Sequence, residues 1–480
     1  MRYNPAMQND TIAAIATPSG TGGIGVIRVS GPDAFSLVLP LFRQSQGRRE
    51  LPPSHLLTYG HIVDPKTSEV LDEVLVAFML APHTYTREHV VEIQGHGGQL
   101  ILRRILRAVL AQGARMANPG EFTLRAFLNG RLDLAQAEAV MDLIEAQTEA
   151  GQRLAMQQLR GRLSEQVQEA AHTLLGVIAR IEASIDFPEE DVPTPQQAEL
   201  QPLIVSAQQL VERLLAGSEQ GRLYRQGLRT AIIGRPNVGK SSLLNGLLRT
   251  ERAIVTPIAG TTRDTVEEVA NIRGIPLHLI DTAGITPTDN PVEQMGVQRS
   301  RAAANGADVI LLVFDGSESL TEQDRQISAE LHTMGFGTNL SETSSSHRRP
   351  VILVVNKSDQ VQRLEIDPLR DLWPHAVLVC TSTVTHEGLT ALEETIAEVA
   401  LAGKTLYSES VLVTSTRHQE ALRRATEHLY ASLVSLEQGL PLDFVSIDLR
   451  AAYDALGEVT GETASDDLLD RIFREFCIGK

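Results

Sequence analysis

The sequence predicts a multidomain protein that combines an α+β unit, an α/β unit on a parallel sheet, and a helical unit split by the α/β unit. Its 480 residues suffice for about three domains of ordinary size. Short β-branched runs come first and long amphipathic helices follow. Residues 228–400 then alternate apolar strands with helices, and helix returns at the end. Helices on both sides of an insertion can pack together, which explains this order.

Each unit is assigned from its own pattern. Strands are expected over residues 11–16, 26–29, 74–78 and 90–93, with a helix over 99–110. Asp133 with Gln136 three residues later predicts a helix start with a capping box. The expected boundaries are 1–120 for the N-terminal α+β unit, 121–226 and 401–480 for the two helical parts, and 227–400 for the α/β unit.

Composition limits the classes of function. The chain has 43 Lys and Arg against 60 Asp and Glu, a net charge of −17, which argues against a non-specific nucleic-acid binder. The first 120 residues are nearly balanced, so a nucleic-acid substrate held at a local basic surface stays possible. Two cysteines, Cys380 and Cys477, form no disulfide framework. Without an apolar leader or a membrane-length apolar stretch, we expect a cytoplasmic protein that does not contact membranes.

A phosphate-binding loop is the strongest motif. Residues 234–241 read GRPNVGKS, between the apolar strand expected at 228–233 and an apolar-periodic helix. Glycines let backbone N–H groups close around phosphate oxygens, Lys240 neutralises charge, and the Ser241 hydroxyl suits Mg²⁺.

Three further motifs follow in the chain order of a GTPase. DTAG at residues 281–284 is placed to meet Mg²⁺ and the γ-phosphate, and Asp359 of NKSD can accept both guanine N–H donors. STV at residues 382–384 is the third motif, a weak form of the segment that contacts the base after NKSD. Each could alone be a turn or a helix cap, but their order at strand ends predicts an inserted Ras-like P-loop GTPase domain. The expected GTP-binding residues are Asn237, Val238, Gly239, Lys240, Ser241, Ser242, Thr256, Pro257, Ile258, Ala259, Gly260, Thr261, Thr262, Asp281, Thr282, Ala283, Gly284, Asn356, Lys357, Ser358, Asp359, Ser382, Thr383 and Val384.

Hydrolysis needs a group that orients water. Ile285 stands where Ras-type enzymes have a glutamine, and an apolar side chain cannot serve. Glu293 is the candidate in the following loop, although a plain surface carboxylate is an equal alternative. A second glycine pattern, GTGGIG at residues 20–25, leads into a strand-like run, so it does not indicate a dinucleotide fold.

With these motifs, the chain resembles the tRNA modification GTPase family MnmE, also called TrmE. TIAAIATPSGTGGIGVIRVSG, EIQGHGG, NPGEFTLRAFLNGRLDLAQAEAV, IDFPEED, IAGTTRD and the terminal FCIGK lie where that family has matching segments, so the resemblance covers the whole chain. It implies a homodimer paired through the N-terminal domains. It also implies K⁺ in place of an arginine finger.

The resemblance assigns roles to single residues. Catalysis is expected from Glu293, Lys240 and Asn237, with Glu293 positioning the attacking water. Mg²⁺ is expected at Ser241 and Thr262, and K⁺ at Asn237, Thr256, Ile258 and Thr261. A reduced folate, 5-formyl- or 5,10-methylene-tetrahydrofolate, is expected at Arg28, Glu92, Arg131 and Lys480 of the folate-binding N-terminal domain and chain end. Cys477 is a possible site residue, with packing as the alternative.

The resemblance also implies the overall activity. GTP hydrolysis would support addition of a (carboxymethyl)aminomethyl group to C5 of the wobble uridine, U34, of certain tRNAs. The carbon would come from tetrahydrofolate, and the work would be shared with the FAD-dependent partner MnmG in a heterotetramer. The alternative from another class is a regulatory or ribosome-assembly GTPase switch without folate chemistry.

Overall fold

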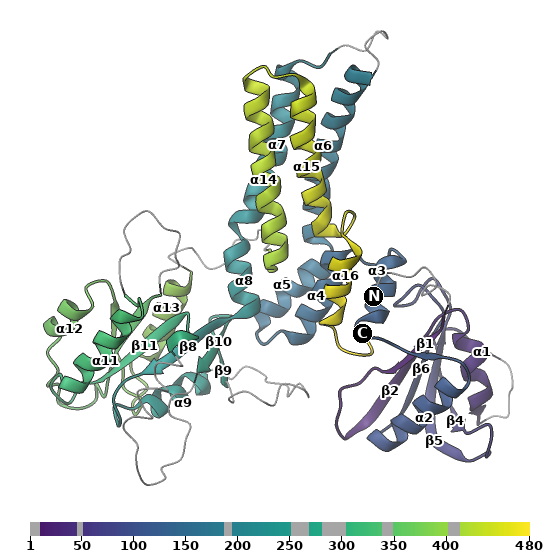
Figure 1. Cartoon of the computed structure of the whole chain (residues 1–480). Helices are drawn as coiled ribbons and strands as arrows, with labels where there is room; N and C mark the ends of the chain where they lie inside the picture. Colours follow the sequence, from purple (N-terminus) through teal and green to yellow (C-terminus); the bar gives the residue numbers. More distant parts are fainter. Residues whose placement is uncertain are drawn as a thin grey trace.

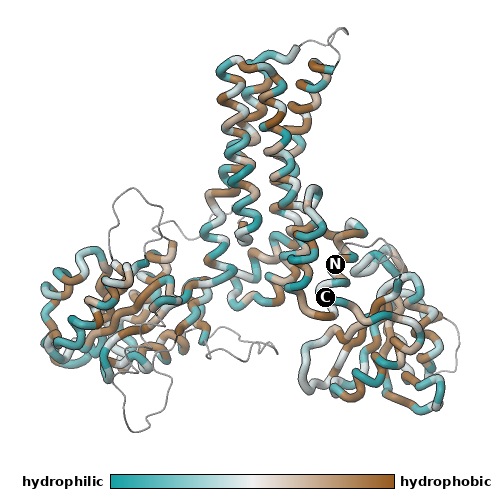
Figure 2. The backbone as a smooth tube through the Cα atoms, in the orientation of Figure 1, coloured by the Kyte–Doolittle hydropathy of each residue, from teal (hydrophilic) through white to brown (hydrophobic). Residues whose placement is uncertain are grey.

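The computed structural model describes residues 10–45, 51–186, 194–250, 268–280, 304–337, 349–401 and 413–480. It shows two sheet-containing units on opposite sides of the lower part of a tall helical bundle (Figure 1). Strands of both sheets are rich in apolar residues, whereas hydropathy alternates along the bundle helices, as expected when only one face of each helix is buried (Figure 2).

The N-terminal unit is a seven-stranded sheet covered by a helix. The strand order is β3-β4-β5-β6-β2-β1-β7, antiparallel except for the β1–β7 pair. Helix α2 packs an apolar stripe that includes Ile105 and Val109 on the sheet. The elements are β1 Ile12–Ile15, β2 Gly22–Ser30, α1 Ala34–Val38, the 3₁₀ turn η2 Leu39–Leu41, β3 Phe42–Gln44, β4 Leu57–Val63, β5 Val70–Met79, β6 Val90–Gly97, α2 Gln99–Ala111, β7 Arg115–Met116 and α3 Glu121–Leu128.

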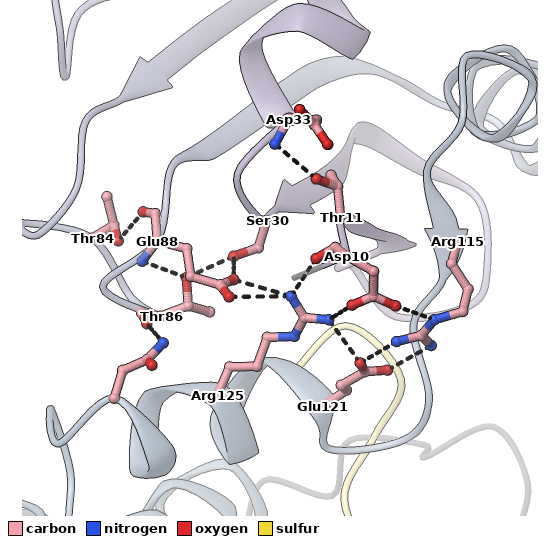
Figure 3. Close-up of polar contacts among 11 residues, drawn as sticks. Asp10, Thr11, Ser30, Asp33, Thr84, Thr86, Glu88, Arg115, Glu121 and Arg125 are labelled. Carbon is pink, nitrogen blue, oxygen red and sulfur yellow. Dashed lines mark hydrogen bonds and ion pairs between the residues drawn. The ribbon is translucent and has the colours of Figure 1, made fainter. Parts of the chain in front are cut away.

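Buried charges attach α3 to this sheet. Arg125 of α3 donates to Asp10 Oδ1 at 2.5 Å, to Glu121 at 3.1 Å and to Glu88 at 3.2 Å. Arg115 bridges Asp10 and Glu121 from β7 (Figure 3). Burial opposes ionisation of Glu121, but bonds from Arg115 and the Asn118 amide and the charge of Arg125 hold its pKa below the usual range. Two cations therefore bring three carboxylates from different segments together.

The helical unit is built from both sides of the insertion. Helices α6 and α7 pack against α14 and α15 around one apolar core. Asp133 caps α4 through the expected box with Gln136. The elements are α4 Leu134–Glu145, α5 Glu149–Leu159, α6 Arg162–Asp186, α7 Gln197–Ala216, α8 Ser218–Gln226, α14 Thr416–Glu437, α15 Leu442–Thr460 and α16 Asp466–Arg474.

The α/β unit has six strands in the order β13-β12-β11-β8-β10-β9. All pairs are parallel except β9–β10, a hairpin turned at Arg273 and Gly274, both with positive φ. The elements are β8 Leu228–Ile233, α9 Lys240–Thr250, β9 Glu268–Ile272, β10 Ile275–Ile280, β11 Val309–Asp315, α11 Glu322–Thr333, β12 Val351–Asn356, α12 Asp367–Leu372, β13 Val377–Cys380 and α13 Leu389–Ala400.

The predicted fold class is confirmed, with differences in detail. The sheet of the α/β unit is mixed, because the β9–β10 turn folds β9 back as an antiparallel edge strand. Strands β3, β4 and β7 were not predicted, because β3 and β7 are only three and two residues long and β4 is interrupted by Gly60. The GTGGIG glycines lie mostly within β2, so the dinucleotide reading is excluded.

We predict that Arg125→Met loosens α3 and β1. The substitution keeps an apolar stem but leaves Glu121, only 3% exposed, with fewer counter-charges. Breaking a buried ion pair from one side costs about 3–5 kcal/mol. Hydrogen exchange of the full chain should show faster exchange in residues 12–15 and 121–128. Arg107→Met on the solvent face of α2 is the control, and equal exchange in both variants would contradict a stabilising network.

Candidate functional site

The phosphate-binding loop connects the end of β8 to the start of α9. Asn237 and Gly239 have φ values of 66° and 98°, a left-handed conformation that suits asparagine and glycine. Lys240 Nζ donates to the carbonyl oxygens of Gly234 at 2.9 Å and Arg235 at 2.8 Å, so its ammonium is held within the loop. Ser241 and Ser242 follow in the exposed first turn of α9. This arrangement suits a bound phosphate chain with its Mg²⁺ ion.

Asn356 joins this loop to the base-recognition motif. Its Nδ2 donates to Val238 O at 2.9 Å, and the residue is only 1% exposed. A Cβ at Gly239 would lie 2.2 Å from that same nitrogen, so only glycine fits. The first residue of NKSD therefore fixes the shape of the phosphate loop from the neighbouring strand, β12.

Asp359 is oriented by the STV segment after β13. Ser382 Oγ donates to Asp359 Oδ1 at 2.6 Å and accepts from the N–H groups of Thr385 at 3.1 Å and Val384 at 3.3 Å. Ser382 is fully buried, whereas Val384 is 76% exposed. The weak sequence match at 382–384 thus has a definite geometric role. The serine holds the carboxylate that would accept both guanine N–H groups.

The side chain of Lys357 is held by Asp315 at the same edge of the sheet. It has a positive φ of 64°, and its Nζ lies 2.6 Å from Asp315 Oδ2 at the end of β11. Burial opposes ionisation of Asp315, but Lys357 and Ser317 keep its pKa below the usual range. Asp315 was not among the predicted site residues. Its position at a strand end of the α/β unit was the only available signal.

Part of the predicted nucleotide site lies outside the described residues. The region includes the segment after α9, the DTAG motif and the proposed water-positioning carboxylate. These positions are Thr256, Pro257, Ile258, Ala259, Gly260, Thr261, Thr262, Asp281, Thr282, Ala283, Gly284 and Glu293. The described hairpin β9–β10 lies between the first group and DTAG in the chain.

Three of the four predicted folate positions come together beside β2 and β6. Arg28 and Glu92 are paired in register, and Arg28 Nε donates to Glu92 Oε1 at 2.9 Å. Arg28 Nη1 also donates to Gly479 O at 3.1 Å, which brings the last residues of the chain to the sheet. Burial and the nearby Arg28 charge lower the pKa of Lys480, while Glu92 opposes them. Residues 28, 92 and 480 therefore share one electrostatic environment.

Tyr85 links the fourth position, Arg131, to this group. The guanidinium of Arg131 lies 4.7 Å from the centre of the Tyr85 ring, and that of Arg28 lies 5.4 Å from it. Arg131 Nη1 donates to Tyr85 O at 3.0 Å. Phe122 adds a second ring, 5.7 Å from the Arg28 guanidinium. Neither ring was predicted as a site residue: Tyr85 lies outside the segments that resemble the family, and Phe122 lies within NPGEFTLRAFLNGRLDLAQAEAV, from which only Arg131 was assigned a role.

Cys477 is exposed, and its backbone makes the described contacts. Its carbonyl oxygen accepts from Gly120 N at 3.3 Å and from Lys480 N at 3.4 Å. Gly479, with φ of 94°, lies so close to β1 that a Cβ would be 2.6 Å from Ile15 O. The C-terminal CIGK segment is thus seated on the N-terminal unit.

Comparisons with known proteins agree with this geometry. A model of the MnmE helical domain matches residues 134–477, and a model of the TrmE N-terminus, described as a GTP-binding protein, matches residues 11–131. The tRNA modification GTPase MnmE of Chloroflexus aurantiacus is 51% identical over 477 residues, covering 98% of this chain and 100% of that protein. This chain belongs to the MnmE family of tRNA modification GTPases.

Other similarities extend the comparison. MnmE of Ligilactobacillus salivarius is 46% identical over 472 residues, covering 98% of each chain. Among solved structures, the G domain of the T. maritima FeoB iron transporter is 28% identical. It covers 36% of this chain and 98% of that one, with a TM-score of 0.26. Within the part of the chain that the structure describes, no helix is both long and apolar enough to span a bilayer.

Membership of the MnmE family establishes the general activity of the chain. The chain is a GTP hydrolase that acts in tRNA modification. GTP with Mg²⁺ agrees with the phosphate loop and with the NKSD motif that Asn356 ties to it.

We predict that Asp359→Asn changes base selectivity. An asparagine retains one acceptor for the base N1–H but presents an N–H donor to the guanine 2-amino group. GTP affinity should therefore fall by about 100-fold or more. The same donor suits the 2-carbonyl of xanthine, so xanthosine triphosphate should bind the variant better than it binds the wild-type protein. Fluorescence titration with both labelled nucleotides measures this, and parallel loss of both would indicate a damaged fold.

Proposed function

We propose that this chain is the K⁺-stimulated GTPase of a tRNA-modifying enzyme that uses a tetrahydrofolate one-carbon unit. Its product is a (carboxymethyl)aminomethyl group at C5 of the wobble uridine, U34. The observation that carries the proposal is the junction of Arg28, Glu92 and Lys480 beside two aromatic rings, in a chain that also holds a guanine-specific loop.

The residues beside β2 and β6 fit a reduced folate. A pterin ring presents several N–H donors, and the side chain of Glu92 is accessible enough to accept them. The benzoyl-glutamate portion carries carboxylates, which suit the guanidiniums of Arg28 and Arg131. The flat ring of Tyr85 lies near both cations. When bound, the folate supplies the carbon that becomes the methylene of the modification.

GTP hydrolysis requires groups around the β/γ bridge. Asn237, which has the left-handed conformation of the loop, is proposed as a K⁺ ligand, and Ser241 as a Mg²⁺ ligand. A monovalent cation there offsets the charge that develops during phosphoryl transfer. Glu293 is proposed to position water. The remaining proposed ligands are Thr256, Ile258 and Thr261 for K⁺ and Thr262 for Mg²⁺.

The proposed assembly extends beyond one chain. Residues 1–120 are proposed to bind folate and pair two copies, residues 227–400 to bind GTP, and residues 121–226 with 401–480 to join them. MnmG, an FAD-dependent protein, is the proposed partner in a cytoplasmic heterotetramer that acts on tRNA. The net charge of −17 favours sharing tRNA binding with MnmG, because an acidic chain gains tRNA affinity from a more basic partner. The full-length match disfavours a switch GTPase without folate chemistry.

We predict that Arg28→Ala weakens binding of 5-formyl-tetrahydrofolate by about 10-fold or more, because a charge-assisted hydrogen bond contributes roughly 1.5–3 kcal/mol. Isothermal titration of the full chain measures this. Arg43→Ala is the control, since Arg43 is exposed on β3 at the far edge of the same sheet. Equal affinity in wild type, variant and control would contradict the folate assignment.

We predict faster GTP turnover in KCl than in NaCl at equal ionic strength, by about 10-fold or more, if K⁺ stabilises charge in the transition state. Asn237→Ala should lose this difference, because the proposed ligand is removed. Steady-state phosphate release measures both, with nucleotide affinity determined in parallel. Equal rates of the wild type in the two salts would disprove the K⁺ assignment.

A further inference from the structure

The tip of the β9–β10 hairpin touches the helical unit. Thr148 Oγ1 donates to Gly274 O at 2.8 Å, across the boundary between the two units. Thr148 also caps α5, because the same oxygen accepts from Gly151 N at 3.1 Å. The residue is only 6% exposed. One buried hydroxyl therefore connects the start of a bundle-base helix to the turn of the hairpin.

Apolar packing strengthens this contact. Ala150 of α5 and Tyr224 of α8 are each 4% exposed and belong to the apolar core of the α/β unit, together with Leu277 of β10. Gly227, which follows α8, lies so close to β10 that a Cβ would be 2.3 Å from Pro276 O. The hairpin is therefore in close contact with two helices of the helical unit.

A polar cluster of buried side chains and the partly exposed Arg225 lies where the inserted unit leaves and re-enters the helical unit. Asp142 of α4 pairs with Arg225 Nε at 2.7 Å, and Arg225 lies near the end of α8, where the chain leaves the helical unit. Thr414 lies just before α14, where the chain returns, and its hydroxyl donates toward Asp142 Oδ2 at 3.4 Å. Gln158 of α5 donates to Thr414 Oγ1 at 3.0 Å. Asp142 thus contacts both connections to the α/β unit.

The cluster is imperfectly packed. Asp142, Gly151, Tyr224, Arg225 and Thr414 line a small pocket at this boundary. Burial raises the pKa of Asp142 to about 6, although the Arg225 charge opposes that change. An ion pair beside a small pocket can be rearranged at smaller energetic cost than one in a close-packed core.

The cluster continues into the bundle. Glu138, one turn before Asp142 on α4, binds Arg417 at 2.7 Å and His418 at 2.6 Å. Both belong to the first turn of α14. Burial opposes ionisation of Glu138, but these two partners hold its pKa well below the usual range. The first turn of α14 is therefore tied to the helix that carries Asp142, although the buried His418 Nδ1 has no hydrogen-bond partner among the described residues.

We propose that the Thr148–Gly274 and Asp142–Arg225–Thr414 contacts are the joint that transmits the nucleotide state of the GTPase unit to the helical unit. This inference rests on the GTPase activity set out above and names positioning residues. The hairpin carries the signal because of its place in the chain. β10 ends at Ile280, directly before DTAG, and β9 begins six residues after Thr262. A rearrangement around the γ-phosphate would act on both ends of the hairpin, whose tip the helical unit holds at Gly274 and Pro276.

The test compares hydrogen exchange of the full chain bound to GDP and to a non-hydrolysable GTP analogue. In the wild type, amides of α5 and the first turns of α14 should differ by about 5-fold between the two states. In Thr148→Val with Arg225→Met the difference should disappear. Nucleotide affinity of this double variant should stay within about 3-fold of wild type, because neither residue lies in the phosphate loop or the base motif.

Matched controls separate coupling from general destabilisation. Thr173→Val with Arg423→Met removes the same groups from exposed positions on α6 and α14, and the nucleotide difference should remain. Thr148→Ser keeps the hydroxyl and should also retain it. A nucleotide difference that persists in Thr148→Val with Arg225→Met, or is absent in the wild type, would overturn the proposal. Failure of the wild type to bind GTP would instead refute the proposed function.

Discussion

The molecule depends on one constraint, which is that the inserted GTPase unit must leave and re-enter a single helical core. Helices α6 and α7 precede the insertion and α14 and α15 follow it, yet their apolar faces share one buried core. Neither half buries its apolar stripe alone. Closing this core brings the two connections together at Asp142 and sets where the GTPase unit attaches.

The same closure brings together the residues of the proposed folate site. Helix α16 packs against α3 beside the bundle, and the chain then ends on the N-terminal sheet, where Gly479 accepts from Arg28. Residues 28 and 480 thus become neighbours although almost the whole chain separates them. The charge network of Arg125, Asp10 and Glu121 holds α3 in place, so the position of Arg131 depends on it as well (Figure 3). A largely buried ionic network therefore helps to place residues of the proposed folate site.

Motif spacing was sufficient to predict the positions of those parts of the nucleotide site whose backbone geometry follows directly from the sequence. The loop before Lys240 and the NKSD segment lie at strand ends, as predicted, because parallel strands bring their carboxyl ends to one edge. The weak STV motif was harder to assess. Only the Ser382–Asp359 bond shows that the serine orients the carboxylate that is predicted to bind the base. Asp315 was missed, since its contact with Lys357 joins two strands without any shared motif.

The sequence by itself determined most of the element types, the split helical unit and the phosphate loop, and it predicted guanine recognition. These depend on local periodicity, on glycine and asparagine conformations, and on hydrogen-bond donors within short segments. The tertiary structure alone decided which distant side chains meet. The contacts of Tyr85 with both Arg28 and Arg131, and the pairing of Asp142 with Arg225, follow from packing across units. Such contacts are fixed by the shape of the closed core, and no pattern within a short window of sequence encodes that shape.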